Sequence, residues 1–94
     1  MSPSLPDIVH DEAASRFEVV VDGLRCVVDY RRTGPVVDLH HTGVPRPLEG
    51  RGIAAALVRA ALDWAAAQGL KVRPSCSYVR VYMQRHPETQ GLRA

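Results

Sequence analysis

The stretch VPRPLEGRGIAAALVRAALDWAAAQGL, residues 44–70, carries the strongest structural signal in the chain. Pro45 and Pro47 end a strand-like run, because proline cannot donate to a sheet ladder. The alanine-rich segment that follows predicts a helix over about residues 51–67, and Gly69 stands where a left-handed C-cap is expected. This helix is apolar around much of its circumference, which indicates that it packs on a sheet.

The segments on both sides of this stretch predict strands and one more helix. RFEVVVDGLRCVVDYRR, residues 16–32, alternates apolar and polar side chains around the DG pair at 22–23, which is favoured in tight type I′ turns. Downstream, LKVRPS at 70–75 predicts a short strand. A helix is expected from near Cys76 until Pro87 ends it.

A third strand is expected in VVDLHHTGV, residues 36–44. Alternation along a strand would place His41 on the same face as Leu39, and His40 on the opposite face. The two imidazoles would therefore point to different sides of the sheet.

These elements together predict a single layered α/β (α+β) domain. Its sheet is expected to be mixed and mostly antiparallel, with about four strands and two helices. The helix between the third and fourth strands is long enough for a parallel crossover. Residues 1–14 are expected to form a flexible N-terminal arm, and residues 15–94 the domain.

Composition excludes several classes of function. The net charge of +2, from 12 basic and 10 acidic residues, is too small to predict a nucleic-acid-binding protein, although Arg31 and Arg32 are adjacent. No apolar run approaches the roughly 20 residues of a bilayer span, and the N-terminus does not resemble a signal peptide. We therefore expect a cytoplasmic protein with no membrane or nucleic-acid partner. The preference for arginine over lysine suggests a GC-rich, bacterial source.

The segment around Gly50 and Gly52 is the first candidate site. Unpaired N–H groups at a helix N-terminus bind anions, and glycines let a phosphate approach the backbone. Arg51 and Arg46 would add charge-assisted hydrogen bonds. The spacing matches neither a Walker A loop nor a dinucleotide-binding fingerprint. The spacing alone therefore leaves two interpretations open, a phosphate site and a simple turn.

Cysteine and histidine provide the second set of candidates. Cys76 lies at a strand-to-helix junction, where the helix dipole lowers a thiol pKa, so it is either an acyl-accepting nucleophile or a small buried side chain. Cys26 lies in an apolar strand and is expected in the core. His41 or His40 could act as a general base near neutral pH. No metal-ligand spacing is present.

The remaining aromatic and basic side chains are expected to have structural roles. Tyr78 and Tyr82 are four residues apart and are expected to pack in the core. Arg85 and His86 would complement the dipole of the last helix. Nothing in the sequence gives His10 a function.

The segment HTGVPRPLEGRGIAAALVRAAL, residues 41–62, resembles the acyl-CoA-binding motif of the GNAT acetyltransferase superfamily, Gln/Arg-x-x-Gly-x-Gly/Ala. Gly52 and Ala54 match this motif, whereas Glu49 occupies its first position and would bring a negative charge near the pyrophosphate. The stretch from Arg16 to Glu88 is similar to a group of minimal, single-domain GNAT-like proteins, through elements such as "HT-VP", "GRGIA", "CSYV" and "RHPE".

This resemblance implies a trimmed GNAT fold that binds acetyl-CoA or coenzyme A. The backbone amides of Val44 and of the loop at 50–54 would hold the pantetheine and pyrophosphate, and Cys76 would lie near the thioester. The residues implied in cofactor binding are Val44, Arg46, Gly50, Arg51, Gly52, Ile53, Ala54 and Cys76.

The leading functional hypothesis is transfer of an acetyl group from acetyl-CoA to a small-molecule or peptide amine. His41 would be the base, with His40 as its substitute, and a variant route would pass the acetyl group through Cys76. The alternative is a CoA-binding sensor or partner module with little catalysis. The protein would be a monomer, or a homodimer formed through an exposed sheet edge.

Overall fold

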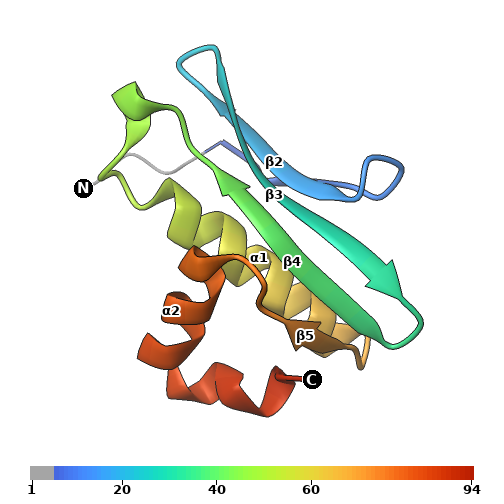
Figure 1. The fold of residues 1–94 in the computed structure, drawn as a ribbon. Coiled ribbons are helices and arrows are strands. Elements are labelled where there is room, and N and C mark those ends of the chain that lie inside the picture. The colour runs from blue at the N-terminus through green and yellow to red at the C-terminus, as the bar shows by residue number, and fades with distance from the viewer. Residues whose placement is uncertain (1–5) are drawn as a thin grey trace.

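Four antiparallel strands joined in chain order form most of the sheet in the computed structural model of the chain, which describes residues 6–94 (Figure 1). The strands are β1 (Val9–Asp11), β2 (Arg16–Val21), β3 (Leu24–Thr33), β4 (Val36–Gly43) and β5 (Lys71–Arg73). The helices are α1 (Ile53–Ala67) and α2 (Ser77–Arg85), with 3₁₀ turns η1 (Arg46–Leu48) and η2 (Pro87–Leu92). The mixed, mostly antiparallel α+β architecture expected from the sequence is confirmed.

The turn between β2 and β3 has the geometry that its sequence predicts. Asp22 and Gly23 have φ angles of 52° and 75°, so both lie in the left-handed region that a type I′ turn requires. Aspartate and glycine tolerate this region better than most residues. The hairpin therefore has a fixed register, with Val21 opposite Leu24.

Helix α1 connects β4 to β5 and makes these two strands parallel. The pairing covers only Val36–Asp38 against Lys71–Arg73, at the beginning of β4. On the outer side of β5, the Ala94 amide donates to the Val72 carbonyl oxygen at 2.9 Å, so the C-terminus covers this edge. Beyond Asp38, β4 continues to Gly43, and no strand within residues 6–94 pairs with it on that side.

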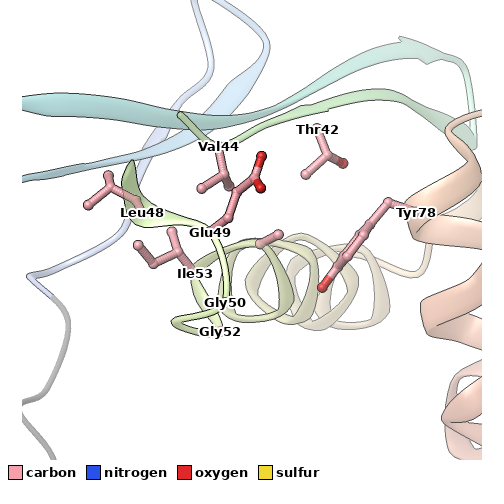
Figure 2. A pocket seen from close by; sticks show the side chains of 9 residues that line it. Thr42, Val44, Leu48, Glu49, Gly50, Gly52, Ile53 and Tyr78 are labelled. Atoms are coloured by element: carbon pink, nitrogen blue, oxygen red, sulfur yellow. The ribbon is translucent and has the colours of Figure 1, made fainter. Parts of the chain in front are cut away.

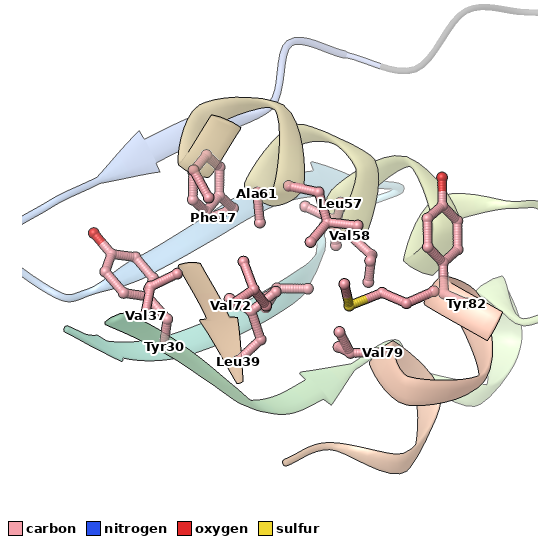
Figure 3. Close-up of a cluster of buried hydrophobic side chains, with 14 of the residues drawn as sticks. Phe17, Tyr30, Val37, Leu39, Leu57, Val58, Ala61, Val72, Val79 and Tyr82 are labelled. Carbon is pink, nitrogen blue, oxygen red and sulfur yellow. The ribbon is translucent and has the colours of Figure 1, made fainter. Parts of the chain in front are cut away.

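Both helices pack on one face of the sheet, which we call the helix face (Figures 1 and 3). Strand residues on this face include Val28, Val37 and Leu39, all fully buried. They pack in one core cluster with Leu57 and Ala61 of α1, as expected for an apolar helix on a sheet. The opposite face, here called the open face, has no helix among residues 6–94.

Strand β1 lies inside the segment expected to be a flexible arm. Residues 9–11 pair with β2, and the His10 ring stacks on Phe17 with a centroid distance of 4.0 Å. A hydrogen bond of 2.7 Å joins His10 Nε2 to the Tyr30 hydroxyl. The expectation of a loose arm is wrong for this strand, and the sheet has five strands rather than about four. Residues 8–12 show no alternation of apolar and polar side chains that would indicate a strand, and residues 1–5 lie outside the described residues.

Candidate functional site

A β-bulge in β4 determines which side chains reach the helix face. Asp29 of β3 pairs with His41, whereas the next residue, Tyr30, pairs with Leu39. His40 is therefore an extra residue on β4, opposite no residue of β3. Because side chains alternate along a strand, one inserted residue exchanges the two faces for everything that follows.

The bulge puts Thr42 on the helix face and His41 on the open face. Thr42 pairs with Val28, which is fully buried under the helices. His41 pairs with Asp29, whose carboxylate accepts a hydrogen bond from Arg16 on the open face. The expectation that His41 shares a face with Leu39 is wrong, because alternation does not reveal a bulge.

Cys76 is held at the helix face, beside the end of β4. Its backbone N–H donates to the Leu39 carbonyl oxygen at 3.0 Å, immediately before the bulge. Cys76 is also the N-cap residue of α2. Its Sγ lies 3.4 Å from Thr42 Oγ1, a hydrogen-bond distance for sulfur. The bulge therefore brings a hydroxyl to the thiol that the sequence singled out.

The surroundings of Cys76 favour its thiolate. Burial opposes ionisation, but the Thr42 hydroxyl and the amides of Val79 and Tyr78 at the start of α2 outweigh this, so the pKa of Cys76 lies below its ordinary value. Cys26 differs, because burial alone acts on it and raises its pKa. Of the two cysteines, Cys76 is therefore the one suited to chemistry.

A cavity of about 470 Å³ extends from Thr42, the neighbour of Cys76, to the start of α1 (Figure 2). β4 and the residue after it contribute Thr42 and Val44, and Tyr78 of α2 lies opposite them. The remaining wall comes from the loop before α1 and from its first turn, including Glu49 and Ala54. The cavity thus brings together parts of the sequence that are more than 30 residues apart.

The two glycines before α1 adopt left-handed backbone conformations. Gly50 has a φ of 81° and Gly52 a φ of 79°, and both line the cavity. Gly52 is the N-cap of α1 and offers no side chain to cap the helix. The first amides of the helix, at Ile53 and Ala54, thus lie on the cavity wall without a side-chain cap. A helix N-terminus of this kind favours anions.

The two arginines expected beside this anion site do not line the cavity. Arg51 is exposed, and its guanidinium donates to Asp22 Oδ2 at 3.0 Å, so it contacts the β2–β3 hairpin. Arg46 lies exposed in η1. Of the other residues that the family resemblance implies in cofactor binding, Val44, Gly50, Gly52, Ile53 and Ala54 line the cavity, whereas Cys76 does not line it and contacts the lining residue Thr42.

Sequence reasoning missed two residues of the site. Thr42 reaches Cys76 only because of the bulge, which leaves no mark in composition. Tyr78 was expected in the core together with Tyr82; it is instead 40% exposed and lines the cavity, whereas Tyr82 is buried. The position of Tyr78 two residues after Cys76, in the first turn of a helix, was the signal available.

A family model described as GCN5-related N-acetyl-transferase matches residues 16–92. The chain belongs to the GCN5-related N-acetyltransferase family. The sequence is 39% identical over 88 residues to Protein NATD1 of both Mus musculus and Homo sapiens, covering 90% of this chain and 80% and 78% of the respective relatives. Protein NATD1 of Danio rerio is 33% identical over the same length.

A solved structure agrees with this family assignment. The chain is similar to the solution structure of a GCN5-like protein from Staphylococcus aureus, with a TM-score of 0.74 and 25% identity, covering 94% of this chain and 87% of the other. The relatives thus include vertebrate and bacterial proteins, so a bacterial source stays a prediction. Within residues 6–94, this acetyltransferase-family chain has no helix of the length and apolarity that crossing a bilayer requires.

Proposed function

We propose that this protein transfers an acetyl group from acetyl-CoA to an amine. The observation that carries the proposal is the cavity itself, which extends from the uncapped start of α1 to Thr42, whose hydroxyl lies 3.4 Å from Cys76 Sγ. One end of the cavity suits a pyrophosphate, and the other suits a thioester. Membership of the GCN5-related family supports acetyl-CoA as the donor.

The residues present fit the donor in chemical terms. The amides of Gly52, Ile53 and Ala54 would hold the pyrophosphate, because the positive end of a helix stabilises anions. Val44 and the end of β4 after Leu39, which pairs with no strand on its β5 side within residues 6–94, would hold the pantetheine arm. The negatively charged Glu49 opposes pyrophosphate binding at this end, and we expect it to weaken affinity.

In the direct route, the amine nitrogen attacks the thioester carbonyl carbon, the C–S bond breaks, and CoA leaves as a thiolate. A base must take the proton from the amine. His41 lies on the open face and His40 is exposed in the bulge, so the geometry does not support our first choice of either as base. Glu49 is the one Asp, Glu or His side chain among the described residues that line the cavity.

In the second route, Cys76 accepts the acetyl group first. Its thiolate attacks the thioester carbonyl carbon and CoA leaves; the amine then attacks the S-acetyl group and releases the Cys76 thiolate. The lowered pKa of Cys76 and its contact with Thr42 support this route. Acetyl-Cys76 trapped by mass spectrometry after mixing with acetyl-CoA alone, together with ping-pong kinetics, would distinguish it from direct attack.

A thermal-shift titration with acetyl-CoA, CoA, ATP and NAD tests donor binding, and amine-dependent release of free CoA tests transfer. We expect stabilisation by the two CoA species only, because only they carry a pantetheine arm that can extend along the cavity to Thr42, beside the Cys76 thiol. No stabilisation by either CoA species would reject the proposal. A panel of polyamines, amino acids and peptides with free amines would then identify the acceptor class.

One observation favours a second candidate, a CoA-binding module without transfer. The two histidines expected to act as bases are both exposed, one in the bulge and one on the open face. A protein that binds CoA, yet releases no CoA with any amine of the panel, would support this second function. The cytoplasmic location and the monomeric or dimeric state stay predictions under either function.

A further inference from the structure

A second cavity adjoins the first, on the outer side of Tyr78. Its volume is about 280 Å³, and it is lined by Ala55, Tyr78, Val81, Tyr82, Arg85 and His86. Tyr78 lines both cavities, and Ala55 follows Ala54, which lines the first. This second cavity therefore begins in the first turn of α1, about 4.5 Å along the helix axis from Gly52.

The walls of the second cavity suit a flat aromatic group. Tyr78 and Val81 are 40% and 41% exposed, so an apolar surface is open to a ligand. In the same cavity the His86 ring stacks on Tyr82, with a centroid distance of 3.9 Å and an interplanar angle of 17°. His86 Nδ1 also donates to the Tyr82 carbonyl oxygen at 2.7 Å, which fixes the ring in place. Nucleobases stack on aromatic walls of this kind.

The same cavity suits an anion, because it is lined by a cation and by no carboxylate. Arg85 forms no ion pair within residues 6–94, whereas the nearby Arg59 is paired with Glu88 at 3.0 Å. Burial and the neighbouring Tyr82 raise the pKa of Tyr78, and the positive charge of Arg85 opposes them, which places that charge near the Tyr78 hydroxyl. A phosphate would find in Arg85 a guanidinium with free donors.

We infer that the second cavity binds the adenosine 3′-phosphate end of coenzyme A, with adenine against Tyr78 and Val81 and the 3′-phosphate on Arg85. This inference rests on the proposed function. A pyrophosphate on the first amides of α1 leaves its adenosine within reach of the first turn of that helix, where the second cavity begins. The thioester end would lie at Thr42, on the wall of the first cavity that β4 provides and beside Cys76.

The competing explanation is that Arg85 only complements the dipole of α2, since it lies in the last turn of that helix. A dipole role changes the stability of the free protein, but it does not distinguish CoA from dephospho-CoA, which lacks only the 3′-phosphate. The preference for CoA over dephospho-CoA therefore measures the proposed contact directly.

Isothermal titration calorimetry with both ligands tests the inference on the wild type, Arg85→Gln and Arg80→Gln. The Arg80→Gln control removes the same charge from the same helix, but Arg80 donates to the Ser75 carbonyl oxygen and does not line the cavity. We expect the wild type and Arg80→Gln to bind CoA roughly five- to tenfold more tightly than dephospho-CoA at low salt. In Arg85→Gln this ratio should fall to about one.

Each outcome has a defined meaning. Equal affinities for the two ligands in the wild type, or a preference retained in Arg85→Gln, would overturn this inference and leave the proposed function standing. Loss of the preference in both variants would indicate a long-range charge effect and also overturn it. If neither ligand binds the wild type, this inference and the proposed function both fail. NMR contacts between adenine protons and the Tyr78 ring in the CoA complex are expected as an independent readout.

Discussion

Arg51 Nη1 lies 3.0 Å from Asp22 Oδ2 and links the loop before α1 to the tip of the β2–β3 hairpin. The pair is exposed, with side chains 53% and 66% accessible, so it contributes little to folding. The pair matters for ligand binding, because Asp22 holds Arg51, one of the cations nearest in sequence to the proposed pyrophosphate site. Asp22 thus competes with an anionic ligand for Arg51.

Replacing Asp22 with Asn should therefore tighten CoA binding. Asparagine tolerates the positive φ of this turn, so we expect the melting temperature to stay nearly unchanged. Freed from its partner, Arg51 should raise the affinity for CoA roughly threefold at low salt, and the gain should disappear at high salt. Asp63→Asn is the matched control, since it removes an exposed carboxylate paired with Arg59 on α1. An equal gain in both variants would contradict a specific role for Asp22.

Gly52 should be more sensitive to alanine than its packing suggests. A Cβ at Gly52 would meet no atom within 4 Å, but its φ of 79° strains any L-residue by about 1 kcal/mol. Gly34 has a φ of 59° and equally open surroundings, in the turn between β3 and β4. Gly52→Ala and Gly34→Ala should each lower the melting temperature by roughly 4–8 °C.

Only the Gly52 variant should also lose CoA affinity, because only Gly52 positions the helix amides that line the cavity. Calorimetric titration of both variants with CoA checks this difference. If the Gly34 variant loses as much affinity as the Gly52 variant, the effect comes from general destabilisation and the proposed pyrophosphate site is wrong.

Thr42→Val should make Cys76 less reactive. The Thr42 hydroxyl is one of the groups that favour the Cys76 thiolate, and valine keeps the shape of threonine without the hydrogen bond. The pKa of Cys76 should therefore rise, and its alkylation by iodoacetamide near neutral pH should slow roughly threefold. Thr33→Val, at the exposed end of β3, serves as the control. The fully buried Cys26 should stay unmodified throughout.

The regular parts of this fold followed from local chemistry. The Asp-Gly pair predicted the β2–β3 turn, and an apolar helix between glycines predicted the crossover from β4 to β5. Gly52 and Ala54, which line the cavity, were singled out by their match to the family motif, and their role in cofactor binding stays a prediction. These features depend on residues close together in the sequence, which is why they could be predicted.

The predictions that were wrong concern features of a different physical origin. Each of these features depends on contacts between segments that are distant in the sequence. The bulge at His40 exists only in the pairing of β4 with β3, and it moved Thr42 toward Cys76 and His41 away from it. Arg51 found its partner in Asp22, 29 residues earlier in the chain. No local pattern records such pairings.

The aromatic cluster around His10 should make the stability of the protein depend on pH. Burial lowers the pKa of His10 below its ordinary value of 6.5, although Glu12 and Asp11 oppose the change. The Tyr30 hydroxyl is 2.7 Å from Nε2, and a neutral imidazole can accept a hydrogen bond from it, whereas a protonated one cannot. Below pH 6.5 the unfolded chain therefore binds a proton at His10 more readily than the folded chain.

The free energy of unfolding should consequently be highest above pH 6.5 and fall as the pH decreases through the folded pKa of His10. His10→Phe keeps the stacking on Phe17 and removes the titration, so its stability should fall less between pH 7.5 and 5 than that of the wild type. His40→Gln removes an exposed histidine and should keep the wild-type profile. Urea unfolding at several pH values measures all three proteins, and identical pH profiles for the wild type and His10→Phe would rule out His10 as the cause. Strand β1 is only three residues long, and His10 joins it to the aromatic rings of Phe17, Tyr30 and Trp64. Amide exchange should therefore show this strand opening first on acidification.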